Sequence, residues 1–202
     1  MDKSTWDRFA PFYTLSRRAD KKAYEEMYSL MRPKVKGRLV LELATGTGLI
    51  SKSISASARK IIATDYSEKM IAHARRGRTP KNVSFRVMDA TDIKYPDNTF
   101  EAVIISNALH VIPNPEKALS EAKRVLRPGG ILIAPTYTHG KMTSSRKLLS
   151  KLLQAFGLRV ESKWSPEEYK DFLIKNGWEI CFEKTAEASF PLTYLECKAK
   201  PE

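Results

Sequence analysis

The stretch "LVLELATGTGLIS", residues 39–51, decides the fold that this sequence predicts. An apolar run of strand length ends in a short segment of Ala, Thr and Gly and then becomes apolar again. Such a passage from a buried strand through a glycine-rich turn into a helix is typical of open α/β sheets. Glycine there lets a ligand approach the bare backbone, and the following helix presents N–H groups that lack intrahelical partners. The stretch therefore predicts a ligand site at the end of a buried strand.

Strand-like and helix-like segments alternate along most of the chain. The strand-like segments are 38–43, 60–65, 82–89, 100–107 and 131–137, and the helix-like ones are 49–58, 67–76 and 115–126. This alternation predicts βαβ units in a parallel sheet with helices on both faces. It stops near the end, where 178–184 and 192–200 are strand-like and separated by a short loop. That pair predicts an antiparallel hairpin.

Length and composition indicate one globular domain. The chain has 202 residues, of which 42% are hydrophobic and 29% charged, which suits a buried core and argues against disorder. No apolar run reaches the roughly 18–20 residues that a membrane-spanning helix needs, and the N-terminus resembles no secretory signal. Cys181 and Cys197 lie far apart with no CxxC pattern. We therefore expect reduced thiols in a cytoplasmic protein and no metal site.

The charge is unusual, because the formal net charge is +12. Residues 141–160 alone hold five basic groups and no acid. This balance favours an acidic partner such as nucleic acid, anionic lipid or an acidic substrate, although a solvated basic face is an equal alternative. Segment 144–160 also has Leu148, Leu149, Leu152, Leu153 and Phe156 on one side of an expected helix. Such a helix either lies on an anionic membrane or packs over a pocket, and both interpretations stay open.

Two carboxylates follow the next two expected strands. Asp65 lies 19 residues after Gly46, where a carboxylate can accept hydrogen bonds from both hydroxyls of a ribose. The alternative is a helix cap, for which Asp65 competes with Ser67. Asp89 ends the third strand and could reach an adenine amino group, with the N–H of Ala90 beside the ring. A loop-capping aspartate is the alternative there.

The motifs "VLELATGTG", "ATDYSEKMIAHAR", "VMDATDIKYPDNTFEAVIISNALHVI" and "EKALSEAKRVLRPGGIL" together resemble class I S-adenosylmethionine-dependent methyltransferases. The resemblance covers roughly residues 38–137 and is strongest to the branch of quinone-biosynthesis and phospholipid N-methyltransferases. It implies a Rossmann-like, seven-stranded, mostly parallel sheet whose last strand is antiparallel, in agreement with the expected hairpin. It also implies S-adenosyl-L-methionine as cofactor and S-adenosyl-L-homocysteine as product. The chain would then be a single domain, 1–202, made of a helical cap (1–36), a cofactor-binding core (37–137), a helical acceptor-side segment (138–176) and a terminal hairpin (177–202).

The same resemblance implies which residues hold the cofactor. They are Tyr13, Glu42, Ala44, Gly46 and Gly48, Ser106 and Asn107 at the methionine part, Asp65 at the ribose, and Tyr66, Met70, Asp89 and Ala90 at the adenine. One position departs from the family pattern, because Ala44 stands where the turn usually has its first glycine. We expect the turn either to enter with φ < 0 at Ala44 or to be reshaped. The spacing also fails GxGxxG, which argues against a dinucleotide-dependent dehydrogenase.

Methyl transfer from a sulfonium is an in-line displacement, so the protein mainly has to align the acceptor and exclude water. The catalytic candidates are His110 and His139, which follow the fourth and fifth expected strands. Each would be a general base or an orienting group, and each could equally be a loop histidine.

The leading interpretation of the acceptor is a small or lipid-like molecule of quinone or phospholipid type, with peripheral contact to the inner face of an anionic membrane as an option. RNA methylation is an alternative that the charge permits, although no Asn-Pro-Pro-Tyr motif follows the fourth strand. A non-catalytic cofactor-binding protein is another. Arsenite methylation is disfavoured because thiols are absent near the expected site.

Overall fold

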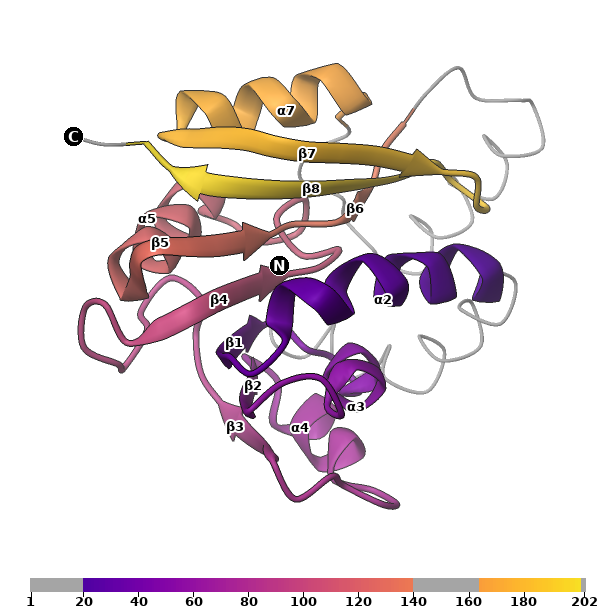
Figure 1. The fold of residues 1–202 in the computed structure, drawn as a ribbon, viewed down its shortest axis with the longest axis vertical. Coiled ribbons are helices and arrows are strands. Elements are labelled where there is room, and N and C mark those ends of the chain that lie inside the picture. The colour runs from indigo at the N-terminus through magenta and orange to yellow at the C-terminus, as the bar shows by residue number, and fades with distance from the viewer. Residues whose placement is uncertain (1–19, 140–163, 201–202) are drawn as a thin grey trace.

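A computed structural model describes residues 20–139 and 164–200, which form an α/β domain (Figure 1). Eight strands of these residues make one sheet: β1 Leu39–Leu43, β2 Lys60–Asp65, β3 Val83–Val87, β4 Phe100–Ile105, β5 Leu126–Ile133, β6 Thr136–Tyr137, β7 Trp178–Ala186 and β8 Leu192–Ala199. The strand order is β3-β2-β1-β4-β5-β8-β6, and β7 pairs with β8 outside this path. Strands β1 to β5 are parallel, whereas β8 is antiparallel to β5, β6 and β7. The predicted α/β fold with a terminal antiparallel hairpin is confirmed.

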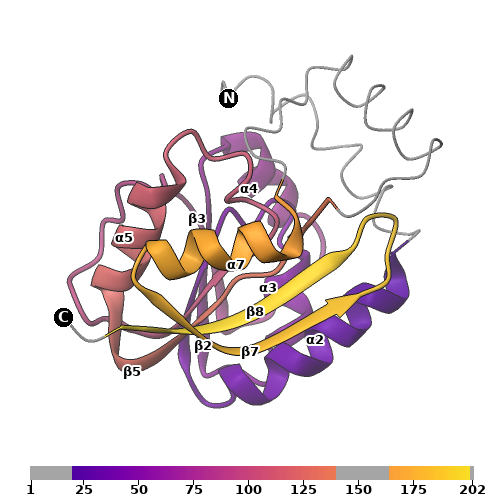
Figure 2. The same ribbon diagram turned by 90° about the horizontal axis from the view of Figure 1, so that it is seen from above.

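The described helices lie in two layers around the sheet. They are α2 Lys21–Val35, α3 Leu49–Ile54, α4 Glu68–Ala74, α5 Pro115–Val125 and α7 Pro166–Lys175. Helices α2, α3 and α4 cover one face and α5 and α7 the other, as Figures 1 and 2 show from two directions. The central strands are therefore buried on both faces, which explains why they read as nearly continuous apolar runs in the sequence.

Strand β1 shows how the pleat divides the core. Val40 packs into the cluster under α2, α3 and α4, whereas Leu41 and Leu43 pack into the cluster under α5 and α7. Glu42 points to the same face as Val40, is 1% exposed, and accepts a hydrogen bond from the Ser51 hydroxyl of α3. This buried polar pair fixes α3 against the strand that leads into the glycine-rich turn.

The starts of three helices carry side-chain caps. The Ser67 hydroxyl accepts from the Met70 N–H of α4, as its position in the sequence predicts, with a donor–acceptor distance of 3.1 Å. The Asn114 side chain accepts from the Lys117 N–H of α5, and Ser165 forms a capping box with Glu168 at the start of α7. These caps fix where α4 and α5 begin relative to the ends of β2 and β4.

One expectation about the elements needs correction. The predicted helix 49–58 ends at Ile54, because residues 55–57 form turns instead. The "PGG" segment 128–130, whose residue types favour a turn, lies inside β5. Phe100 of β4 pairs with Leu126, and the next pair is Ala102 with Ile131, so residues 127–130 form a bulge in a continuous strand. Tyr13, the cap up to residue 19 and the basic helix expected at 144–160 lie outside the described residues.

Glu121 and Arg124 on α5 hold the loop that leads away from the end of β3. The Glu121 carboxylate accepts from the Ile93 N–H at 2.9 Å, and Arg124 donates to the carbonyl oxygens of Ile93 and Tyr95 at 2.8 and 2.9 Å. Hydrogen bonding to Arg124 lowers the pKa of Glu121 to about 2. The stability that Glu121 contributes is therefore present above its ordinary pKa and is lost as the pH falls from about 4.5 toward 2.

Replacing Arg124 by Met is expected to lower the free energy of unfolding by about 3 kcal/mol at pH 7, because the buried Glu121 carboxylate loses its nearest cation and keeps the more distant Lys117, at 3.7 Å. Urea unfolding measures this loss. Arg127→Met is the matched control, since Arg127 donates only an exposed bond to the Asn98 carbonyl, and it should change stability by no more than about 0.5 kcal/mol. Equal losses in both variants would contradict the assigned role of Arg124.

A candidate cofactor pocket at the carboxyl edge of the sheet

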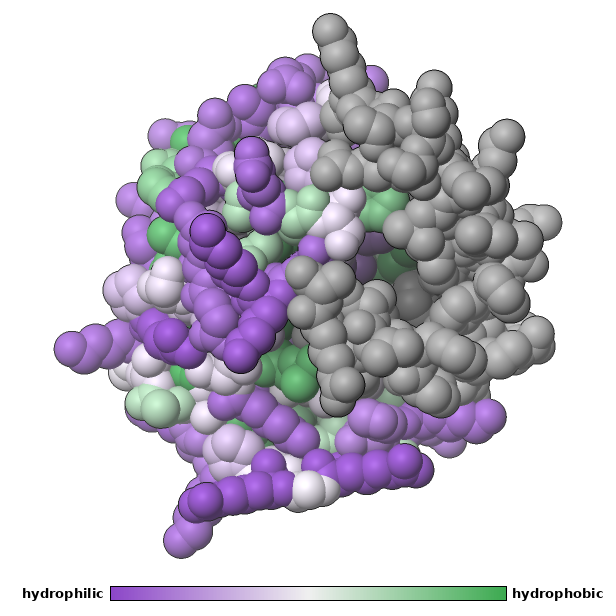
Figure 3. Space-filling view, turned by 90° about the vertical axis from the view of Figure 1, so that its right-hand side faces the viewer, coloured by the Kyte–Doolittle hydropathy of each residue, from purple (hydrophilic) through white to green (hydrophobic). Residues whose placement is uncertain are grey.

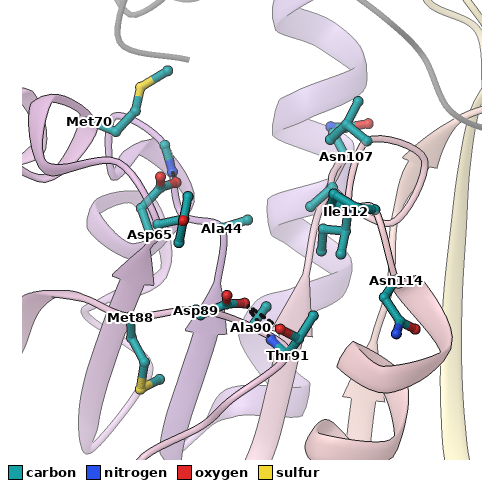
Figure 4. Close-up of a pocket in the computed structure, with 15 residues that line it drawn as sticks. Ala44, Asp65, Met70, Met88, Asp89, Ala90, Thr91, Asn107, Ile112 and Asn114 are labelled. Carbon is teal, nitrogen blue, oxygen red and sulfur yellow. Dashed lines mark hydrogen bonds between the residues drawn. The ribbon is translucent and has the colours of Figure 1, made fainter. Parts of the chain in front are cut away.

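A pocket of about 360 Å³ opens beyond the carboxyl ends of β1, β2, β3 and β4 (Figure 4). Its wall is made by Ala44, Gly46, Asp65, Tyr66, Met70, Met88, Asp89, Ala90, Thr91, Asn107, Ala108, Val111, Ile112, Pro113 and Asn114. Strand β1 pairs with β2 on one side and with β4 on the other. Strands β2 and β3 are therefore added to one side of β1, and β4 and β5 to the other side, so the strand order reverses between β1 and β4. Ligands of open α/β sheets bind at this switch point, and the volume is typical of a small-molecule site.

The turn after β1 takes an unexpected backbone conformation. Ala44 has φ +52° and Gly46 has φ +57°, so the first of the two alternatives expected for this turn, φ < 0 at Ala44, is wrong. A left-handed conformation costs a residue with a Cβ about 1–2 kcal/mol. Two hydrogen bonds impose it: Thr45 N–H donates to the Thr64 carbonyl, and Gly46 N–H donates to the Asp65 carboxylate, both at 2.8 Å.

Asp65 joins the turn after β1 to the turn after β2. One carboxylate oxygen accepts from Gly46 N–H, and the other accepts from Ser67 N–H at 2.9 Å. The side-chain cap of α4 comes from Ser67, so Asp65 does not act as that cap. Asp65 instead stands in the pocket wall with its carboxylate orientation fixed.

Asp89 and Ala90 also line the pocket. One Asp89 oxygen accepts from both the N–H and the hydroxyl of Thr91 at 2.8 Å, shown by dashed lines in Figure 4. Asp89 thus caps its loop, as the alternative interpretation expected, and faces the pocket as well. Tyr66, 50% exposed, and Met70, 2% exposed, add an aromatic ring and a thioether to the same wall.

Three of the predicted residues stand behind the wall rather than in it. Glu42 and Ser106 are buried, at 1% and 6% exposure. Gly48 is the left-handed N-cap of α3, with φ +75°, and a Cβ there would lie 2.6 Å from the Phe85 ring. The requirement for glycine at this position therefore comes from the left-handed backbone and from the close approach of the Phe85 ring of β3.

Some lining residues escaped prediction from the sequence. Met88 and Thr91 flank the predicted Asp89 and Ala90, so their position in the "MDATD" loop was a usable signal. The others are Ala108, Val111, Ile112, Pro113 and Asn114, which follow β4. Apolar wall residues follow no motif, because many side chains can supply such a surface. They give the pocket an apolar side opposite the polar end at Gly46 and Asp65.

His110 lies in the segment that forms the apolar wall, and its ring Nδ1 is 3.0 Å from the hydroxyl of the buried Thr136. Desolvation, with a smaller contribution from the neighbouring His139, lowers the pKa of His110 to about 4. His139 packs its ring edge-on against Phe190, with 5.6 Å between centroids, and its backbone N–H donates to the Trp164 carbonyl. The structure thus brings the two candidate histidines near each other beyond β4 and β6.

The residues at 20–139 and 164–200 offer no cluster of three His, Cys, Asp or Glu side chains that could hold a metal ion. Cys181 and Cys197 lie on the neighbouring strands β7 and β8 as free thiols. Within the same ranges, no helix has the length and apolar character that crossing a membrane requires.

Comparison with known proteins gives consistent results. A family model described as a methyltransferase domain matches residues 41–134. A demethylmenaquinone methyltransferase of Paenarthrobacter aurescens is 34% identical over 137 residues, covering 66% of this chain and 53% of the relative. A phosphatidylethanolamine N-methyltransferase of Cereibacter sphaeroides is 32% identical over 132 residues, covering 60% and 63%. The chain spans about half the length of the curated relatives it matches.

A solved structure extends the likeness over the whole chain. The DhpI complex with S-adenosylhomocysteine superposes with a TM-score of 0.75 at 26% identity, covering 99% of this chain and 96% of that one. The fold and the matched core define a methyltransferase domain with S-adenosylmethionine as its cofactor. Residues 41–134 thus belong to the methyltransferase-domain family, and the chain is similar to class I S-adenosylmethionine-dependent methyltransferases, among them relatives named for quinone biosynthesis and phospholipid N-methylation.

Ala44→Gly is expected to raise the free energy of unfolding by about 1 kcal/mol, because glycine adopts the left-handed conformation without the Cβ penalty. Chemical unfolding of both proteins measures the difference. Ala108 lines the same pocket, and Ala108→Gly serves as the control. Ala108 is not among the residues with positive φ in the described chain, so this variant should lose stability. A loss of stability in Ala44→Gly would contradict the strain assigned to the turn.

Proposed function

We propose that the pocket binds S-adenosyl-L-methionine and that the protein transfers its methyl group to a small-molecule or lipid-like acceptor of quinone or phospholipid type. The observation that carries the proposal is the fixed Asp65 carboxylate beside the Gly46 turn at the β1–β4 switch point. A carboxylate in this position is suited to the two hydroxyls of a ribose. The names of the matched relatives support the acceptor classes.

The pocket residues suit the parts of this cofactor. Asp65 would hold the ribose, and the left-handed turn of Ala44 and Gly46 would hold the methionine part together with Asn107. The adenine would lie near Tyr66 and Met70, with Asp89 and Ala90 at its edge. The lining of one continuous pocket supports these proposed contacts, and Gly48, Glu42 and Ser106 would support the wall from behind.

The cofactor supplies a methyl group on a sulfonium, which already carries a good leaving group. The residues of this chain therefore have to orient the acceptor and exclude water. With a pKa near 4, His110 is a neutral imidazole at pH 7 and a weak base. We assign it the role of orienting the acceptor through hydrogen bonds, with the nearby His139 as the second residue on this side.

We propose that the basic surface of the protein makes peripheral contact with an anionic membrane. Residues 69–88 contain six Lys or Arg and no acid, and Arg75, Arg76, Arg78 and Lys81 among them are exposed. They surround the connection between α4 and β3 at the lower end of Figure 1, and hydrophilic residues gather at the same end in Figure 3. Electrostatic attraction to anionic lipid would hold the protein at the cytoplasmic face.

Calorimetric titration with S-adenosylhomocysteine tests the cofactor site. The wild type is expected to bind, and Asp65→Asn should weaken binding at least about tenfold, because an amide cannot replace both carboxylate acceptors. Asp92→Asn is the control, since Asp92 is exposed, lies outside the pocket wall and pairs with Lys94. Absence of binding by the wild type would refute the proposed function. Anionic and neutral vesicles, added as separate arms, show whether membrane contact depends on lipid charge.

The shifted pKa of His110 has a consequence for stability. The folded state keeps His110 neutral down to pH about 4, whereas the unfolded chain protonates it near 6.5. Stability should therefore decline as the pH falls from about 6.5 to about 4, because the unfolded state binds the extra proton. Unfolding free energies across this range should fall less steeply in His110→Gln than in the wild type. Parallel curves would contradict the assigned neutral state.

A further inference from the structure

Asn107 follows β4 with φ +51° and lines the pocket. Four hydrogen bonds hold it, one of them a long bond from the amide nitrogen to the neighbouring Ser106 hydroxyl at 3.4 Å. Its backbone N–H donates to the Pro135 carbonyl at 2.8 Å, its side-chain oxygen accepts from the Tyr137 N–H at 2.9 Å, and its amide nitrogen donates to the Tyr24 hydroxyl at 3.1 Å. Because the Tyr137 backbone can only donate, the orientation of the Asn107 amide is determined. Figure 4 shows this residue at the strand end beside α2.

The side-chain hydrogen bonds continue from Tyr24 to Tyr137 and from Tyr137 to Asp20. The Tyr137 hydroxyl donates to the Asp20 carboxylate at 2.8 Å and is hydrogen-bonded to Tyr24 as well. Asp20 accepts only, so Tyr137 must use its proton on Asp20, and Tyr24 must therefore donate to Tyr137. The chain runs from Asn107 through Tyr24 and Tyr137 to Asp20. Burial and these neighbours raise the pKa of Tyr137, so it stays protonated and able to donate.

The far end of this chain is firmly anchored. Asp20, 7% exposed, precedes α2, and its second oxygen accepts from the backbone N–H and the hydroxyl of Ser189 at 2.6 and 2.8 Å. Ser189 belongs to the connection between β7 and β8. We call Asp20, Tyr24, Asn107, Tyr137 and Ser189 the tyrosine clamp. It joins the start of α2, strand β6 and the β7–β8 connection to one residue of the pocket wall.

The geometry of the pocket wall depends on Asn107. Leu43 of β1 pairs with Ile105 of β4, so the two left-handed residues Ala44 and Asn107 follow neighbouring strand ends. A left-handed residue other than glycine persists only where its surroundings hold it. The turn at Ala44 is held by Asp65, and the turn at Asn107 is held by the clamp. Loosening Asn107 would let the wall from Ala108 to Asn114 shift relative to the Gly46 turn.

We propose that Tyr137 and Asp20 are positioning residues of the methyl-transfer site, acting on the cofactor pocket through Asn107. The inference rests on the proposed function, because it names residues that shape the same site. Neither Tyr137 nor Asp20 lines the pocket. Any effect of Tyr137 or Asp20 on ligand binding therefore has to pass through a residue that lines the pocket, which is Asn107. An experiment can thus distinguish this positioning role from direct contact with the ligand.

The first test compares Tyr137→Phe with Tyr194→Phe in the calorimetric titration with S-adenosylhomocysteine. Both changes remove one hydroxyl that donates to a carboxylate, Asp20 in one case and Glu196 in the other, at 2.8 and 3.0 Å. Tyr137→Phe keeps the backbone N–H bond to Asn107 and the ring packing, yet it breaks the clamp. We expect the dissociation constant to rise about fivefold in Tyr137→Phe and to change less than about twofold in Tyr194→Phe. Equal dissociation constants in the two variants would overturn the proposal.

The second test is a double-mutant cycle with Asn107→Gly, which keeps the left-handed conformation but removes the amide that the clamp holds. In this background Tyr137→Phe should cause no further weakening of binding, because its route to the pocket is gone. A full additional loss would show that Tyr137 acts on the ligand by another route and would overturn the assignment. A dissociation constant of the double variant equal to that of Asn107→Gly alone supports the assignment of Tyr137.

Amide hydrogen exchange without ligand separates this inference from the proposed function. Peptides covering residues 105–114 should exchange severalfold faster in Tyr137→Phe than in the wild type, and Tyr194→Phe should leave them unchanged. Faster exchange supports the clamp even if the wild type fails to bind S-adenosylhomocysteine, a result that would refute the cofactor assignment alone. Unchanged exchange at 105–114 would overturn the clamp, whatever the titration shows.

Discussion

The hydrogen bond from Gly46 N–H to the Asp65 carboxylate is the contact on which the pocket depends. It ties the end of β1 to the end of β2 and imposes a left-handed turn on a chain that has alanine at the first position. Because the same carboxylate also accepts from Ser67, it sets the start of α4 as well. One side chain thus fixes two turns and a helix start, and the polar end of the pocket follows from it.

Much of the fold could be predicted from the sequence because its signals are local. The apolar runs at β1 and β2 match their strands, since both faces of a central parallel strand are buried. The bulge in β5 was not predictable in this way, because "PGG" favours a turn locally and only pairing with β4 draws it into the strand. The left-handed conformation of Ala44 could not be predicted from the sequence for the same reason. It is set by Thr64 and Asp65, which are distant in sequence.

The candidate site shows the same division. Gly46, Asp65 and Asp89 were recognisable because glycine and carboxylates at strand ends carry a chemical meaning that few other residues can replace. The apolar wall after Asn107 was not, since several side chains can give equivalent surfaces. The tyrosine clamp was beyond reach as well, because its hydrogen bonds join residues separated by 83, 117 and 169 positions. No local sequence pattern indicates contacts between residues that are so far apart in the chain.

The residues of the clamp and those of the pocket wall differ in where they lie relative to the matched family core. Every residue of the pocket wall falls between Ala44 and Asn114, inside the matched family core of 41–134, whereas Asp20, Tyr24, Tyr137 and Ser189 fall outside it. The matched core supplies the whole pocket wall, and the flanking segments supply hydrogen bonds that hold Asn107. Substitutions outside 41–134 can therefore change how firmly the wall is held without changing any residue that lines it.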